Sequence, residues 1–139
     1  MITTNSDGQA LSEAFAQAVS QGIVGYDLAL VARDGAALAE VIASLPEACG
    51  NAVAIPADLA LEDAYESVVG ECVAQLGGLD VLVNCAGLSQ AGPFEEVSPE
   101  QWDRIFAVNA KAPFFISRAL CCVFKQFTLF PHRNKYKIM

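Results

Sequence analysis

Apolar residues along this chain alternate between helical stripes and short continuous runs. Residues 8–21, 35–45 and 61–76 carry apolar side chains at three- and four-residue spacing, the pattern of one buried helix face. Residues 27–33 (DLALVAR), 52–57 (AVAIPA) and 79–84 (LDVLVN) are apolar runs of strand length. Pro56, near the end of the second run, favours an edge position in a sheet. The pattern predicts three helix–strand units in succession, followed by a further helix.

Boundary residues support these elements. Ser98-Pro99-Glu100-Gln101 has the form of a capping box with proline at the first helical position, and it opens a helix that continues past Asn109. Gly77-Gly78 supplies a stop for the helix over residues 61–76, and Asp58 is expected at its N-cap.

Strands that are apolar throughout are buried on both faces, and strands that alternate with helices form a parallel sheet. The sequence therefore predicts an α/β fold with a doubly wound, Rossmann-like parallel sheet. A length of 139 residues allows one domain. We expect that domain to be incomplete, with the first strand nearly absent and later strands missing.

Charge divides the chain into two parts. All 16 acidic residues and one base, Arg33, lie in residues 1–103, whereas the remaining seven bases and no acid lie in residues 104–139. We therefore expect a partial dinucleotide-binding domain over residues 1–121 and a divergent basic tail over residues 122–139. The formal net charge of −8 argues against a nucleic-acid-binding protein.

Composition bounds the environment of the protein. The apolar stretch over residues 112–131 is interrupted by Arg118 and Lys125 and makes a poor membrane span. Five cysteines form no C-x-x-C pair, so we expect small buried thiols, a reducing cytoplasmic location and no metal site.

Ligands of parallel α/β sheets bind beyond the carboxyl ends of the strands. The residues found there are Arg33-Asp34, Asp58-Leu59 and Asn84-Cys85-Ala86-Gly87. Each has a simpler interpretation: Arg33 as a solvated charge, Asp58 as a helix cap, and Asn84 or Gly87 as turn residues. Their order and spacing together favour a binding crevice.

These motifs, with Asn109-Ala110-Lys111, resemble the short-chain dehydrogenase/reductase family over about residues 8–125. The resemblance implies that Asp58-Leu59 borders the adenine pocket and that Asn84-Cys85-Ala86-Gly87 lies along the cofactor. It also implies that Asn109 belongs to the catalytic tetrad. Residues 82–115 look like the 3-oxoacyl-carrier-protein reductase type, whose substrates are small carbonyl compounds or acyl thioesters.

The end of the second family strand indicates the cofactor. An acidic residue there favours NAD by bonding the ribose hydroxyls, but this chain has Ala32 followed by Arg33. A guanidinium can pair bidentately with a 2′-phosphate. The resemblance therefore implies NADP(H).

Two departures from the family pattern concern the cofactor loop and the proton-transfer residues. The glycine-rich loop, T-G-x-x-x-G-x-G, aligns with residues 3–10 and keeps only Thr3 and Gly8, which lowers the expected affinity for the pyrophosphate. None of the three tyrosines is followed four residues later by lysine, so Tyr-x-x-x-Lys is absent, and Ser117 comes too soon after Asn109 to be the catalytic serine.

The leading hypothesis is therefore a truncated, inactive NADP(H)-dependent oxidoreductase that would act on carbonyl and alcohol groups. The alternative is a non-catalytic nucleotide-binding or dimer-modulating fragment. It would form a homo-oligomer through the Asn109 helix with Trp102, Phe106 and Phe114, unless these rings simply pack in the core. A flavodoxin-type module is a third reading, which the Asn-Cys-Ala-Gly spacing disfavours. The sequence does not determine the substrate.

The short first strand makes a prediction about stability. Only Met1, Ile2 and Thr3 precede the loop, yet in this strand order the first strand lies between two others. Neighbouring backbone that lacks partners is costly to bury, so we expect the isolated chain to be weakly stable or to aggregate. Thermal unfolding with light scattering checks this. A cooperative transition of a monomer would contradict it.

Overall fold

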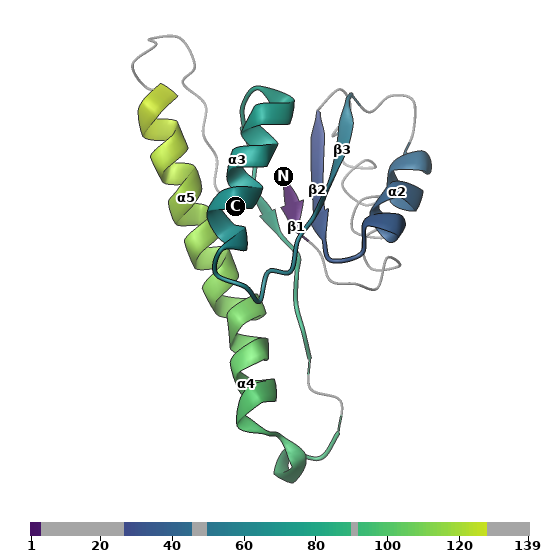
Figure 1. Cartoon of the computed structure of the whole chain (residues 1–139), viewed down its shortest axis with the longest axis vertical. Helices are drawn as coiled ribbons and strands as arrows, with labels where there is room; N and C mark the ends of the chain where they lie inside the picture. Colours follow the sequence, from purple (N-terminus) through teal and green to yellow (C-terminus); the bar gives the residue numbers. More distant parts are fainter. Residues whose placement is uncertain (4–26, 46–49, 90–91, 128–139) are drawn as a thin grey trace.

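The sheet has four parallel strands. A computed structural model describes residues 1–3, 27–45, 50–89 and 92–127 (Figure 1). Its strands are β1 (Ile2–Thr3), β2 (Leu28–Ala32), β3 (Ala52–Pro56) and β4 (Val83–Asn84). They are ordered β3-β2-β1-β4, with β1 hydrogen-bonded between β2 and β4. The Rossmann-like parallel sheet and the edge position of β3 are thereby confirmed.

Helices cover both faces of the sheet, and β2 shows why its sequence is apolar throughout. Ala29 and Val31 belong to the core under α3 (Ala64–Leu76) and α5 (Ala112–Phe127), whereas Leu30 and Ala32 pack with Leu38 of α2 (Gly35–Ala43). Successive strand residues point to opposite faces, so a strand covered on both sides must be apolar at every position. All five residues of β2 are buried.

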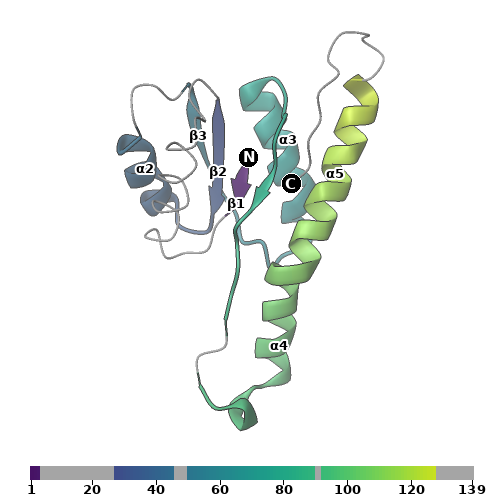
Figure 2. The ribbon, with the colours of Figure 1, turned by 180° about the vertical axis from the view of Figure 1, so that it is seen from behind.

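One long helical segment runs beside the sheet (Figures 1 and 2). It consists of α4 (Pro99–Phe106), a π-helical turn η2 (Ala107–Lys111) and α5, which packs beside α3. A short 3-10 turn, η1 (Phe94–Glu96), precedes it. Figure 1 shows α4 extending past the sheet, at the end where the chain leaves β4.

The predicted helix boundaries are confirmed at two places. Ser98 Oγ accepts the Gln101 N–H and the Gln101 side chain accepts the Ser98 N–H, with Pro99 at the first position, which completes the capping box. Gly77 ends α3 in the left-handed conformation, with φ of 73°.

The N-cap prediction for Asp58 is wrong. Helix α3 begins at Ala64 after Asp63, so Asp58 lies several residues upstream, where its carboxylate accepts the Ala60 N–H within a turn. The predicted helix began too early because its apolar pattern included Leu61, which is exposed in this turn.

The predicted strand over residues 79–84 is also shorter in the structure. Ladder pairing needs a neighbour, and β1 offers only Ile2 and Thr3, which pair with Val83 and Asn84. The predicted helix over residues 8–21 lies outside the described residues.

Two expectations about burial need correction. Cys72 is buried, but Cys85, Cys121 and Cys122 are exposed, and Cys49 lies outside the described residues. Core packing of the three aromatic side chains is likewise wrong, since Trp102, Phe106 and Phe114 are 54%, 48% and 65% exposed.

The segment Pro99–Val123 is long and apolar enough to cross a membrane by length and composition alone. This is weak support for a membrane span, because the core helix of a globular domain passes the same test. Here Ala112, Ile116 and Leu120 pack into the core with α3.

Tyr65 gives a stability prediction for this core. Its side chain is 4% exposed and its ring stacks on Phe115, but its hydroxyl has no hydrogen-bond partner among the described residues. Burial also raises the pKa of the hydroxyl, with a smaller opposing effect from Lys111. A buried hydroxyl without a partner costs stability, so Tyr65→Phe should raise the free energy of unfolding by about 1 kcal/mol.

Chemical denaturation of the two proteins measures the difference, with Tyr65→Leu as a control that also removes the stacked ring. A loss of stability in Tyr65→Phe would show that the hydroxyl has a partner, such as a bound water.

Candidate functional site

Four of the predicted residues meet beyond the carboxyl ends of the strands. Arg33, Asp58, Leu59 and Ala86 line one small hollow of about 20 Å³ together with Ala57, Leu88, Arg104 and Val108. Three separate strand ends and the long helix supply these side chains. The structure therefore brings these side chains together at the edge of the sheet where parallel topology predicts ligand binding.

Arg33 and Asp34, which follow β2, have different roles. The Asp34 carboxylate caps α2 by accepting the N–H groups of Ala36 at 2.9 Å and Ala37 at 3.1 Å. Because this carboxylate is engaged at the helix start, the charge that β2 presents to the hollow is the exposed guanidinium of Arg33.

Asp58 is held in place by two hydrogen bonds. Its Oδ1 accepts the Ala60 N–H at 3.0 Å, and its Oδ2 accepts a hydrogen bond from Nη2 of Arg104 at 2.9 Å. Burial alone would raise the pKa of this carboxyl. The two hydrogen bonds and the positive charges of Arg104 and Arg33 outweigh that effect and lower the pKa below its usual value.

Asn109 joins the helix to the loop that follows β4. Its Oδ1 accepts the Leu88 N–H at 2.7 Å, and its Nδ2 donates to the Leu88 carbonyl at 2.8 Å. The residue lies in the π-helical turn between α4 and α5, a feature frequent at functional sites. Both polar atoms of its amide are used to position the Leu88 backbone.

The remaining predicted residues are less engaged. Asn84 is exposed at the end of β4, where it pairs with Thr3. Gly87 is half-buried, and a methyl group added there would come no closer than 3.8 Å to Oδ1 of Asn109. Gly8 lies outside the described residues.

Sequence reasoning missed Arg104. It pairs with a residue 46 positions away, a separation at which no local pattern operates. One signal was available: Arg104 is the first base after Arg33. The 70 residues between them contain no base, and all their charged side chains are acidic. A lone base among many acids has a high chance of an acidic partner.

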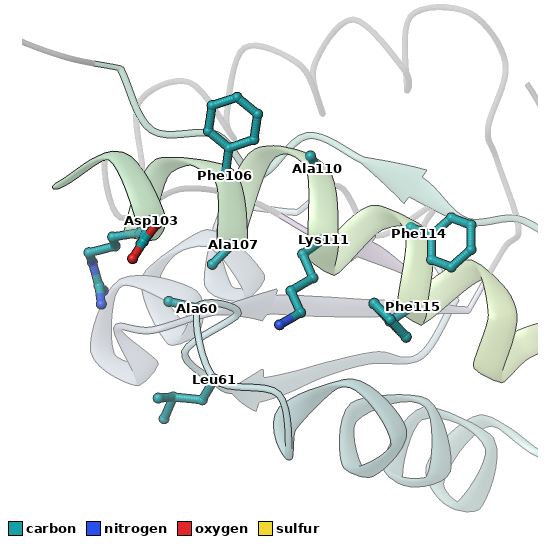
Figure 3. Close-up of a pocket in the computed structure, with 10 residues that line it drawn as sticks. Ala60, Leu61, Asp103, Phe106, Ala107, Ala110, Lys111, Phe114 and Phe115 are labelled. Carbon is teal, nitrogen blue, oxygen red and sulfur yellow. The ribbon is translucent and has the colours of Figure 1, made fainter. Parts of the chain in front are cut away.

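A second, open groove adjoins the hollow (Figure 3). It has a volume of about 810 Å³ and lies between the long helix and the turn at Ala60-Leu61. Lys111 points across it toward this turn and forms an ion pair with Glu62, whereas Phe106 points away from the turn. The residues that line the groove are Ala60, Leu61, Asp103, Arg104, Phe106, Ala107, Ala110, Lys111, Phe114 and Phe115.

Sequence comparison identifies the family. The family model described as short chain dehydrogenase matches residues 3–127, so the chain belongs to the short-chain dehydrogenase family. A short chain dehydrogenase from Pseudocercospora fijiensis is 32% identical over 116 residues, which are 81% of this chain and 35% of that relative. Versicolorin reductase 1 from Aspergillus parasiticus is 30% identical over 80% of this chain and 40% of its own length.

Solved structures agree with the fold. A metagenomic short-chain oxidoreductase in complex with NADP has a TM-score of 0.68 and 29% identity, covering 91% of this chain and 56% of that one. A 3-ketoacyl-(acyl-carrier-protein) reductase from Brucella melitensis, complexed with NADH, has a TM-score of 0.68 and 28% identity, covering 90% and 50%. The chain spans less than half the length of the two curated relatives above.

The family binds a nicotinamide cofactor. The hollow brings together the carboxylate of Asp58, the guanidinium of Arg33 and the apolar side chains of Leu59 and Val108. In the described part of the chain, no three His, Cys, Asp or Glu side chains cluster as metal ligands would.

The lowered pKa of Asp58 predicts a pH-dependent stability. A carboxyl whose pKa is lower in the folded than in the unfolded state stabilises the fold above the unfolded pKa, about 3.9 for aspartate. That contribution disappears as the pH falls through the lower, folded value. Asp58→Asn, which keeps an acceptor for Ala60, should therefore be less stable than the parent at pH 7 by roughly 0.5–1 kcal/mol.

Denaturation at pH 7 and at pH 3 checks this, and the difference between the two proteins should shrink at pH 3. An equal difference at both pH values would show that the ionised carboxylate is not what matters.

Proposed function

We propose that residues 1–121 form the nucleotide-binding part of an NADP(H)-dependent oxidoreductase that interconverts carbonyl and alcohol groups. The single observation that carries this proposal is the convergence of Arg33, Asp58, Leu59 and Ala86 on one hollow. Family membership supplies the reaction class, and the hollow supplies side chains suited to the adenosine end of the cofactor.

A preference for NADP over NAD is supported by the end of β2. NAD binding to this fold uses a carboxylate there for the ribose hydroxyls, but β2 ends at buried Ala32. The next side chain is the guanidinium of Arg33, and the carboxylate of Asp34 caps α2. The two solved relatives described above carry NADP and NADH respectively, so the preference rests on Arg33.

The catalytic step is proposed to involve Asn109, which orders the Leu88 backbone beside the hollow. The 139 residues contain no Tyr-x-x-x-Lys. We therefore propose that they hold the nucleotide without reducing a substrate by themselves. A 3-oxoacyl thioester is the proposed substrate class of a complete enzyme, supported by the 3-ketoacyl-(acyl-carrier-protein) reductase among the structural relatives.

A second candidate role is self-association through the Asn109 helix. It is favoured by the exposed rings of Trp102, Phe106 and Phe114 on α4 and α5. Exposed aromatic side chains are enriched at protein–protein contacts.

We also propose a cytoplasmic location. The five cysteines are odd in number and form no C-x-x-C pair, which is typical of proteins of reducing compartments.

Titration with nucleotides tests the proposed function. A ligand that binds the folded state raises its thermal stability by mass action, so NADPH should raise the unfolding temperature more than NADH does. Arg33→Ala should remove this difference, because an exposed charge-assisted contact to the 2′-phosphate is lost. A loss of about tenfold in affinity for NADPH is expected, while the affinity for NADH should stay within about twofold.

Arg118→Ala is the matched control, because it removes an arginine, on the long helix, that does not line the hollow. A parent protein that responds to neither nucleotide would contradict the proposed binding. Oxidation of NADPH by the chain with a 3-oxoacyl thioester would contradict the proposed lack of turnover.

A further inference from the structure

The carboxylate of Asp58 shares the hollow with two arginines. Arg104 donates to it directly at 2.9 Å, and Arg33 lies close enough for its positive charge to help keep the carboxyl ionised. All three side chains line the same hollow. Any anion that Arg33 attracts must therefore also approach the negatively charged carboxylate of Asp58.

This closeness creates an electrostatic conflict for an NADP site. A 2′-phosphate carries close to two negative charges at neutral pH, and it would meet a carboxylate within the range over which Arg33 acts on Asp58. NAD, which has a hydroxyl at this position, meets no such repulsion. Asp58 by itself therefore favours NAD.

We propose that Arg104 is a specificity-determining positioning residue: by pairing with Asp58 it offsets the carboxylate charge and so lets a 2′-phosphate approach Arg33 beside the hollow. The proposal rests on the proposed function and deepens it. Arg104 acts here through Asp58 and not by touching the phosphate.

The geometry distinguishes this ion pair from an ordinary surface pair. The side chains of Arg104 and Asp58 are 42% and 29% exposed, whereas those of Arg118 and Glu66 are 58% and 84% exposed and their charged atoms are 4.0 Å apart. Asp58 is also held by the Ala60 N–H, so its carboxylate has a fixed direction when Arg104 is removed. The unpaired charge would then stay at the hollow.

The long helix holds Arg104 in register with Asp58. The capping box at Ser98 and Gln101 fixes the start of α4 one turn before Arg104. The two Asn109 hydrogen bonds to Leu88 fix the helix on the other side. Arg104 therefore connects the adenosine side of the hollow to the helix that carries Asn109.

A double-mutant cycle tests the proposal. Calorimetric titration gives the dissociation constants of NADPH and NADH for the parent, Arg104→Gln, Asp58→Asn and the double variant. Arg104→Gln should lower the preference for NADPH over NADH about three- to fivefold, the size expected of a partly exposed ion pair. Adding Asp58→Asn should restore the parental preference, because the repelling charge is then gone.

Arg118→Gln is the matched control, since it removes an arginine of the same long helix that does not border the hollow, and its preference should equal that of the parent. An equal loss of affinity for NADPH and NADH in Arg104→Gln would overturn the proposal, because that is the effect expected of a merely structural residue. A lowered preference that Asp58→Asn does not restore would also overturn it, since Arg104 would then contact the phosphate itself.

Failure of the two claims is distinguishable. A parent that binds neither nucleotide overturns the proposed function and this inference with it. If the parent binds NADPH and Arg104→Gln leaves the preference for NADPH over NADH unchanged, only the inference is overturned.

Discussion

The two residues of β1 hold the sheet together. Ile2 pairs with Leu30 of β2 on one side and with Val83 of β4 on the other, and Thr3 does the same with Val31 and Asn84. A buried strand edge without partners is costly, so these few pairs connect the two halves of the parallel sheet. β2 leads to Arg33 and β4 leads to Ala86, so β1 also sets how the two sides of the hollow face each other.

A second set of links joins the strand ends to the long helix. Asn109 binds the Leu88 backbone after β4, Arg104 binds Asp58 after β3, and Lys111 pairs with Glu62 in the following turn. Each link joins the long helix to a segment that follows a strand of the sheet. The helix thus serves both as a core element, through Ile116 and its neighbours, and as the wall that fixes the hollow. We propose that coenzyme selectivity depends on the charges of Arg33, Asp58 and Arg104, which come from three elements.

Local patterns predicted the elements that depend on local causes. The two-sided burial of β2 follows from its apolar run, and the start of α4 follows from the Ser98–Gln101 capping box. The strand ends also placed Arg33, Asp58, Leu59 and Ala86 at one edge, because parallel topology requires it. The length of β4 could not be predicted in this way, because it depends on how many residues β1 offers. The partner of Asp58 could not either, since Arg104 reaches it only after the helix has packed.

We propose that the 2′-phosphate of NADP binds at Arg33 while Arg104 stays on Asp58. A crystal structure of the chain with NADPH measures this most directly. We expect the 2′-phosphate within hydrogen-bond distance of the Arg33 guanidinium, the adenine beside Leu59, and the Arg104–Asp58 pair intact. A phosphate held by Arg104 with Asp58 released, or a nucleotide bound away from the hollow, would show that the proposed arrangement is wrong.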